Sequence, residues 1–389
     1  YYPQDEFAYR ALSGYEPCSL AAFRDWVVKQ RGGLAQVNQA WGKRFATAAD
    51  IQPPSDKEPT LAWADWQEFR RWAQMDFTRL VYDTLKQADP DHVVIWSLPF
   101  MGWYGDCASW WRFPPVSDVL MRHGIGYSTG IFRLKMLSAL AQWSGKPANA
   151  LCMPPEYNPS FVQMSFLMDG PQSGLSHVCT AGTIENGPYM GSADPRDNWR
   201  RREPLYTRSR SLNDLWRQMG PTLLSSRPRP PQVGVYISDR QVLLEGLNLN
   251  SLNGALQLLA DLNLDTEVFS ELSWDRLKQY RAVVLGSFSR CADAKMAADL
   301  KQFVQNGGML VMTDGALATD ENNLPADRGL DELVGSTEAA RAELKEPIAV
   351  AAHDLTRGLT SLPPWGRSPS ASPPVARPSS PTSRARARS

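Results

Sequence analysis

The chain has 389 residues, and its 41 lysines and arginines balance its 41 aspartates and glutamates. A formal net charge of zero provides no long-range field that would attract nucleic acid or an anionic membrane, so neither is expected as a partner. No apolar run reaches the roughly 18 residues of a membrane-spanning helix, so no membrane span is predicted.

Cysteine and histidine usage argues against a metal site. No two of the five cysteines are spaced as in a CxxC metal or redox motif, and the four histidines form no HExxH pattern. An odd and scattered set of cysteines favours buried free thiols over a disulfide framework. We therefore expect no metal and no cofactor. The cysteines are Cys18, Cys107, Cys152, Cys179 and Cys291.

Helical patterns dominate the first quarter of the chain, over residues 19–33, 34–42 and about 63–87. Ser19 is the candidate N-cap of the first helix, and Gly32 with Gly33 is expected to end it. The third helix has apolar side chains at helical spacing: Trp66, Phe69, Trp72, Phe77, Leu80 and Val81. Four tryptophans at helical positions are read as packing residues: Trp26, Trp41, Trp66 and Trp72.

Short apolar runs then alternate with helical patterns, which predicts strand–helix–strand repetition and a parallel sheet. The run VVIWSLPF is continuously apolar, as in a parallel strand buried on both faces. Strands are expected near residues 93–98, 116–122, 148–153 and 175–181. Helices are expected over residues 131–143, 159–174 and 211–224.

A second unit begins after a Pro-rich linker at residues 226–232. Four apolar runs and two amphipathic patterns predict a compact, doubly wound α/β domain over residues 233–352. The segment 367–389 contains only Arg, Ser, Pro, Ala, Val and Thr, a composition that cannot bury enough surface to become ordered.

Two stretches resemble one enzyme family. SLAAFRDWVVKQRGGLAQVNQAWGKRF, followed by WADWQEFRRWAQMDF, resembles the β-galactosidases of glycoside hydrolase family 42. QYRAVVLGSF and then LKQFVQNGGMLVMTDG resemble the trimerisation domain of that family, which has a glutamine-amidotransferase-like fold. The resemblance covers roughly residues 1–345, and its first part is the more specific.

The resemblance implies an α/β fold that combines a (β/α)8 TIM barrel with a doubly wound domain. The fourth barrel strand of the family ends in Asn-Glu, and this pair aligns with Asp5-Glu6. The chain is therefore expected to be truncated at the N-terminus. Residues 1–225 would supply only the C-terminal half of the barrel, with the four expected strands matching strands 5 to 8.

The resemblance also implies a catalytic set. Glu6 would be the general acid/base, and Glu156, which follows a strand, would be the nucleophile of a retaining glycosidase acting on β-galactosides or similar β-glycosides. Glu185 matches a family acid near the sugar hydroxyls. Asp5 stands where the family has an Asn that donates to the sugar 2-hydroxyl, and an ionised carboxylate offers only acceptors.

Aromatic and acidic residues in the loops have two readings. One of the loop tryptophans Trp103, Trp110 and Trp111 is expected to form a stacking platform for the sugar, with Trp103 as the candidate. The competing reading is that these side chains fill the core beneath the loop. Asp118 could face the barrel centre, but a packing or pairing role is favoured. Cys18 alone cannot form a zinc site of four ligands.

Two alternatives to a glycosidase stay open. The chain could be a non-catalytic carbohydrate-binding or assembly protein, which Asp5 in place of Asn favours. An amidotransferase-like enzyme in the second domain is disfavoured, because Cys291 falls several residues beyond the strand that would present a nucleophile. The expected partners are a β-linked saccharide and, at full length, two further copies in a homotrimer. The fragment itself is expected to be inactive, and a cytoplasmic location is favoured over secretion.

Overall fold

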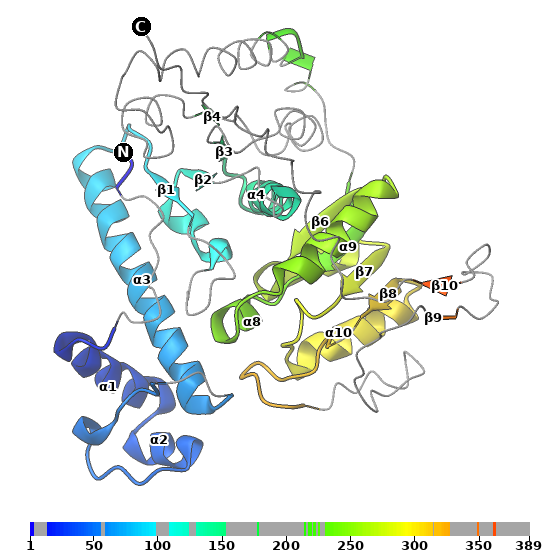
Figure 1. Cartoon of the computed structure of the whole chain (residues 1–389). Coiled ribbons are helices and arrows are strands. Elements are labelled where there is room, and N and C mark those ends of the chain that lie inside the picture. Colours follow the sequence, from blue (N-terminus) through cyan, green and yellow to red (C-terminus); the bar gives the residue numbers. More distant parts are fainter. Residues whose placement is uncertain are drawn as a thin grey trace, which may run out of the picture. The chain divides into compact units, whose positions relative to one another are not determined.

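The computed structural model describes residues 1–3, 14–55, 59–98, 109–123, 130–152, 177–178, 230–313 and 315–326, with short stretches between 214 and 225 and at 348–349 and 361–362. The chain forms two compact units, Tyr1–Leu333 and Val334–Ser389. Figure 1 shows the elements coloured along the sequence. In the second unit, β9 (Ile348–Ala349) and β10 (Ser361–Leu362) form a short antiparallel pair.

The first helices lie where the sequence predicts them, with one correction at a helix start. They are α1 (Pro17–Arg31), α2 (Leu34–Trp41) and α3 (Leu61–Ala88), with a 3-10 turn, η1 (Ala48–Asp50), before α3. The N-cap of α1 is Glu16 and not Ser19, because Pro17 takes the first helical position, where its missing N–H costs nothing. Gly32 ends the helix in the left-handed conformation, at φ 85°.

Helix α3 buries two different faces along its length. Trp66 and Phe69 in its N-terminal half pack against α1 and α2, while Val81 and Leu85 in its C-terminal half pack towards the first sheet. The set of apolar side chains that the sequence places at helical spacing is therefore only partly buried. Three of its members are exposed: Trp72 by 45%, Phe77 by 45% and Leu80 by 64%.

The first sheet contains four parallel strands that are neighbours in chain order. They are β1 (Ile95–Ser97), β2 (Val119–His123), β3 (Ala148–Cys152) and β4 (His177–Val178), with α4 (Gly130–Ser144) between β2 and β3. The crossover from β1 to β2 contains two 3-10 turns, η2 (Trp110–Arg112) and η3 (Pro114–Val116). The predicted parallel sheet is confirmed.

The N-terminal residue lies beside β1. The amino group of Tyr1 donates to the carbonyl of Val93 at 2.6 Å, and the N–H of Ile95 donates to the carbonyl of Tyr1 at 2.8 Å. One residue bonded to positions i and i+2 of its neighbour is the hydrogen-bond pattern of a parallel ladder. The chain from Tyr1 therefore runs in the same direction as β1.

The second sheet is also parallel, with the order β6-β5-β7-β8. Its strands are β5 (Val233–Tyr236), β6 (Thr266–Phe269), β7 (Ala282–Leu285) and β8 (Met309–Met312). The accompanying helices are α8 (Asp239–Leu244), α9 (Leu249–Asp261) and α10 (Ala294–Gln305), with the 3-10 segment η5 (Glu271–Gln279) after β6. A first strand flanked by the second and third is the order of a doubly wound sheet.

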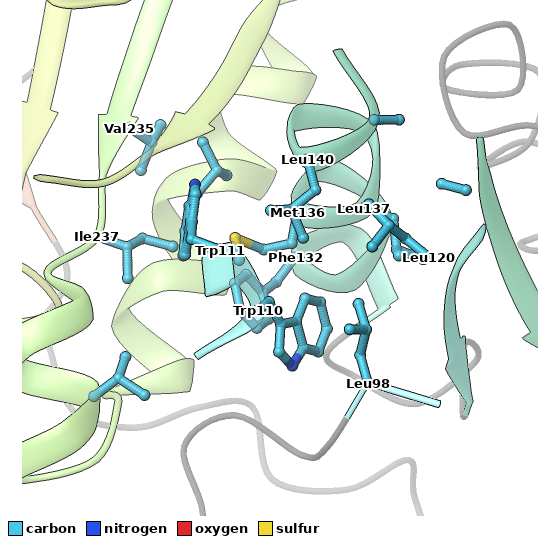
Figure 2. Packing of buried hydrophobic residues seen from close by; sticks show 14 of the residues in the cluster. Leu98, Trp110, Trp111, Leu120, Phe132, Met136, Leu137, Leu140, Val235 and Ile237 are labelled. Carbon is cyan, nitrogen blue, oxygen red and sulfur yellow. The ribbon is translucent and has the colours of Figure 1, made fainter. Parts of the chain in front are cut away.

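One hydrophobic cluster contains side chains from both sheets. Trp111 lies between Met136 of α4 and the side chains of Val235 and Ile237, which belong to β5 and the residue after it (Figure 2). The ring of Trp110 stacks on Phe132 of α4 with centroids 6.1 Å apart. Burying two indoles in this way removes a large apolar area from water, which makes the contact between the sheets a packed interior.

Candidate active site

The carboxyl ends of β1 to β4 define the candidate site. Parallel neighbouring strands end at one edge of their sheet, so the segments that follow these ends start from the same edge. The predicted site residues belong to the segments that follow Tyr1–Pro3, β1, β3 and β4. All of them lie outside the described residues: Asp5, Glu6, Trp103, Glu156 and Glu185.

Three buried polar groups were not singled out from the sequence. Ser97 ends β1, Ser109 precedes η2, and Gln67 faces inward from α3, each at most 1% exposed. The two hydroxyl oxygens and the Gln67 amide nitrogen have no hydrogen-bond partner among the described residues. A buried polar atom without a partner is uncommon in folded proteins. Serine and glutamine carry no sequence signal that would distinguish them here.

The loop tryptophans beyond Trp103 are core residues. Trp110 is 1% exposed and Trp111 is 2% exposed. Of the two readings of these side chains, the structure supports the one in which they fill the core. Neither indole presents a free face on which a sugar could stack.

Asp118 has the pairing role that the sequence favoured. It precedes β2, at the amino end of the sheet, and accepts hydrogen bonds from the Val94 N–H at 2.9 Å and the Tyr82 hydroxyl at 2.8 Å. Lys86 lies 3.2 Å away. Burial alone would raise the pKa of Asp118, but these three donors outweigh it and hold the pKa below its ordinary value.

Cys291 in the second sheet domain is a buried thiol. It is 1% exposed and accepts a hydrogen bond from the Thr319 hydroxyl at 3.3 Å. Burial raises the pKa of the thiol to about 12, which leaves almost no thiolate at neutral pH. The expectation of buried thiols is correct for Cys291 and wrong for Cys18, which is exposed.

A charged cluster connects α3 to the carboxyl edge of the second sheet. Arg71 pairs with Asp239 at 2.8 Å, with both side chains 2% exposed. Glu271 accepts the backbone N–H of Asp239 at 2.9 Å and that of Arg240 at 2.7 Å. Arg240 also pairs with Glu68 of α3. The partners are far apart in sequence, 168 residues for Arg71 and Asp239, so residue spacing could not reveal them.

In the described part of the chain, no group of three or more His, Cys, Asp or Glu side chains is placed to hold a metal ion. Among the helices described, none is both long and apolar enough to cross a membrane.

The chain is similar to β-galactosidases in both sequence and fold. The family model for glycoside hydrolase family 42, described as β-galactosidase, matches residues 3–163. A β-galactosidase from Arthrobacter sp. is 33% identical over 78 residues, which cover 18% of this chain and 11% of that protein.

Solved structures extend the likeness of fold over most of the chain. The β-galactosidase from Bacillus circulans sp. alkalophilus has a TM-score of 0.59 at 17% identity, covering 86% of this chain and 54% of its own. That from the haloarchaeon Halorubrum lacusprofundi has a TM-score of 0.60 at 16% identity, covering 86% and 55%. The chain thus spans about half the length of these enzymes. The family model and the curated relative show that residues 3–163 are similar in sequence to the β-galactosidases of glycoside hydrolase family 42.

Proposed function

We propose that this chain forms part of a retaining glycoside hydrolase that cleaves terminal β-D-galactosides or similar β-glycosides. The match of residues 3–163 to the β-galactosidase family model supports a β-linked saccharide as the substrate. The β-galactosidase name of the relative from Arthrobacter points to galactose as the sugar. Glu6 is proposed as the general acid/base and Glu156 as the nucleophile.

One observation carries this proposal: β1 to β4 are parallel neighbours in chain order, and Tyr1 hydrogen-bonds beside β1 in the same direction. In the sequence, Glu6 comes three positions after Pro3, Glu156 comes after the end of β3, and Glu185 comes after the end of β4. In TIM barrels the catalytic side chains come from the carboxyl ends of several strands. The chain order therefore favours convergence of these acids on one edge.

The proposed mechanism divides the work between two glutamates. Glu6 holds a proton in the resting enzyme and donates it to the oxygen of the leaving group as the glycosidic bond breaks. Glu156 stays ionised and attacks the anomeric carbon from the opposite face, which requires the two carboxyl groups to be about 5–5.5 Å apart. Glu6 then removes a proton from water, which displaces Glu156 and restores the sugar with its configuration retained.

The remaining site residues are proposed to orient the sugar. Glu185 would accept hydrogen bonds from sugar hydroxyls, and Trp103 would stack on the apolar face of the ring. Asp5 lies next to Glu6 in the chain, and its negative charge would favour the protonated form of that acid. Asp5 can also accept a hydrogen bond from the 2-hydroxyl, whereas the family amide donates one.

The domain arrangement that we propose follows the same family. Residues 1–225 form the C-terminal half of a TIM barrel, and the linker 226–232 leads to an amidotransferase-like trimerisation domain at 233–352. The order β6-β5-β7-β8 and the buried thiol of Cys291 support a non-catalytic, doubly wound domain. The segment 367–389 is proposed to take no part in the fold.

The test is hydrolysis of nitrophenyl β-galactoside by the complete gene product. We expect Glu156→Ala and Glu6→Ala to lose at least about 10³-fold in kcat. Azide should restore turnover of an activated substrate, giving an α-glycosyl azide with Glu156→Ala and a β-glycosyl azide with Glu6→Ala. Asp275→Asn, an exposed change in η5, is the matched control and should retain full activity.

A second candidate function rests on Asp5. A carboxylate in place of the family amide removes a donor to the 2-hydroxyl, which would suit a carbohydrate-binding protein without turnover. If the wild type and Glu156→Ala bind galactose equally and neither turns over substrate, this second function is correct. Recovery of turnover in Asp5→Asn would assign the loss to that substitution.

A further inference from the structure

The carboxyl edge of the second sheet carries two acids that the proposed hydrolysis does not use. Asp239 follows β5 and Glu271 follows β6, and these strands are parallel neighbours, so the acids lie at the same edge. The strand order reverses at β5, which has β6 on one side and β7 on the other. Open α/β sheets bind their ligands at this position, outside the carboxyl ends of the strands.

Arg71 of α3 occupies this position. Its Nη1 donates to Oδ2 of Asp239 at 2.8 Å, and its Nη2 donates to the Asp239 carbonyl oxygen at 3.1 Å. The other carboxylate oxygen, Oδ1, is buried and accepts no hydrogen bond from the residues that the structure describes. A carboxylate held away from water, with acceptor capacity to spare, is a strong receptor for the planar fork of a guanidinium.

Glu271 holds the receptor in place. Its Oε2 accepts from the Asp239 N–H at 2.9 Å and from the Tyr236 hydroxyl at 3.1 Å. Burial, and then the negative charge of Asp239, raise the pKa of Glu271 to about 7. Titratable and charged groups face this pair from every packed element: Arg71 of α3, Tyr236 of β5, Arg240 of α8 with its partner Glu68, and Cys291 beyond β7 with its neighbour Glu245.

We propose that Asp239, held in place by Glu271, forms a guanidinium-binding socket whose occupant is Arg71 of the same chain. Open α/β sheets bind small ligands at this position, but here it binds a side chain of α3. Helix α3 is the helix that leads into β1 of the first sheet. The ion pair thereby fixes α3 to the carboxyl edge of the second sheet. This proposal does not depend on the proposed hydrolase activity. Each of its tests measures the stability of the fold and not the turnover of a sugar.

The first test empties the socket with Arg71→Ala in the full chain. The buried Asp239 then lacks its cation, and the unfolding midpoint should fall by at least about 5 °C. Millimolar methylguanidinium chloride should recover part of the loss, whereas methylammonium chloride at the same concentration should recover less, because it lacks the fork. Lys295→Ala breaks an exposed pair with Asp299 and is the matched control, with little change expected.

The pH dependence of the stability loss in Arg71→Ala distinguishes the loss of the ion pair from the loss of side-chain packing. An ion pair stabilises the fold only while its carboxylate is charged, so the loss caused by Arg71→Ala should be smaller at pH 5 than at pH 8. A loss that came only from the missing side-chain volume would be the same at both values. A pH-independent loss, or equal recovery with both cations, would overturn the socket.

A double variant keeps the test decisive if Arg71→Ala does not fold. Arg71→Met with Asp239→Leu replaces the ion pair by apolar side chains of similar size, which is often neutral or stabilising. We expect this pair of changes to fold and to be more stable than either single variant. A double variant no more stable than the worse single variant would show that the two residues do not act as occupant and receptor.

Discussion

Two cysteines illustrate how surroundings set the chemistry of a side chain. Cys18 is exposed, while Cys291 is buried against Thr319 with its pKa raised to about 12 by burial. In the folded protein, iodoacetamide should therefore alkylate Cys18 quickly and Cys291 only after unfolding in urea. Peptide mass spectrometry after timed labelling measures both rates. Labelling of Cys291 as fast as Cys18 would contradict the buried thiol.

Glu271 should impose a pH dependence on stability. Its pKa is about 7 in the folded chain against an ordinary value of 4.5, so the folded state holds the proton more tightly. The stabilisation is fully present below about pH 4.5 and is lost as the pH rises through about 7. Urea unfolding at pH 5 to 8 should show this decline in the wild type and a flatter profile in Glu271→Gln. The exposed Asp261→Asn is the control, and an unchanged slope in Glu271→Gln would contradict the assignment.

At the scale of elements, α3 offers a matched pair of tryptophans. Trp66 is fully buried between Tyr15, Phe23 and Phe69, whereas Trp72 is 45% exposed. Trp66→Ala should lower the free energy of unfolding by about 3–5 kcal/mol, and Trp72→Ala by less than about 1 kcal/mol. Urea denaturation of both variants measures the difference. Equal losses would mean that the two faces of α3 are buried alike.

Elements were more predictable than contacts. The strands β1, β5 and β7 lie in continuous apolar runs, because a strand covered on both faces needs apolar side chains throughout. Periodicity could not tell which side of α3 is buried, since the helix changes packing partners halfway along. The Arg71–Asp239 pair depends on long-range folding, which residue spacing does not encode. The identities of Glu6 and Glu156 came from family resemblance, because a lone glutamate carries no signal.

At the scale of the whole molecule, the shared core predicts that the two sheets are coupled. Trp111 packs on α4 and on β5, so Trp111→Ala opens a cavity that touches both sheets (Figure 2). Backbone hydrogen exchange should speed up in peptides from α4 and from β5 alike. Trp72→Ala is the control and should leave both regions unchanged. Faster exchange on one side only would show that the sheets unfold independently.

The most direct test of the proposed hydrolase traps its covalent intermediate. A 2-deoxy-2-fluoro-β-galactoside with a dinitrophenyl leaving group should inactivate the complete gene product, because the fluorine slows the second step more than the first. Mass spectrometry of the digested protein should find one fluorogalactosyl group, on the peptide that contains Glu156. A label on another acid, or turnover with inversion and no label, would contradict Glu156 as the nucleophile.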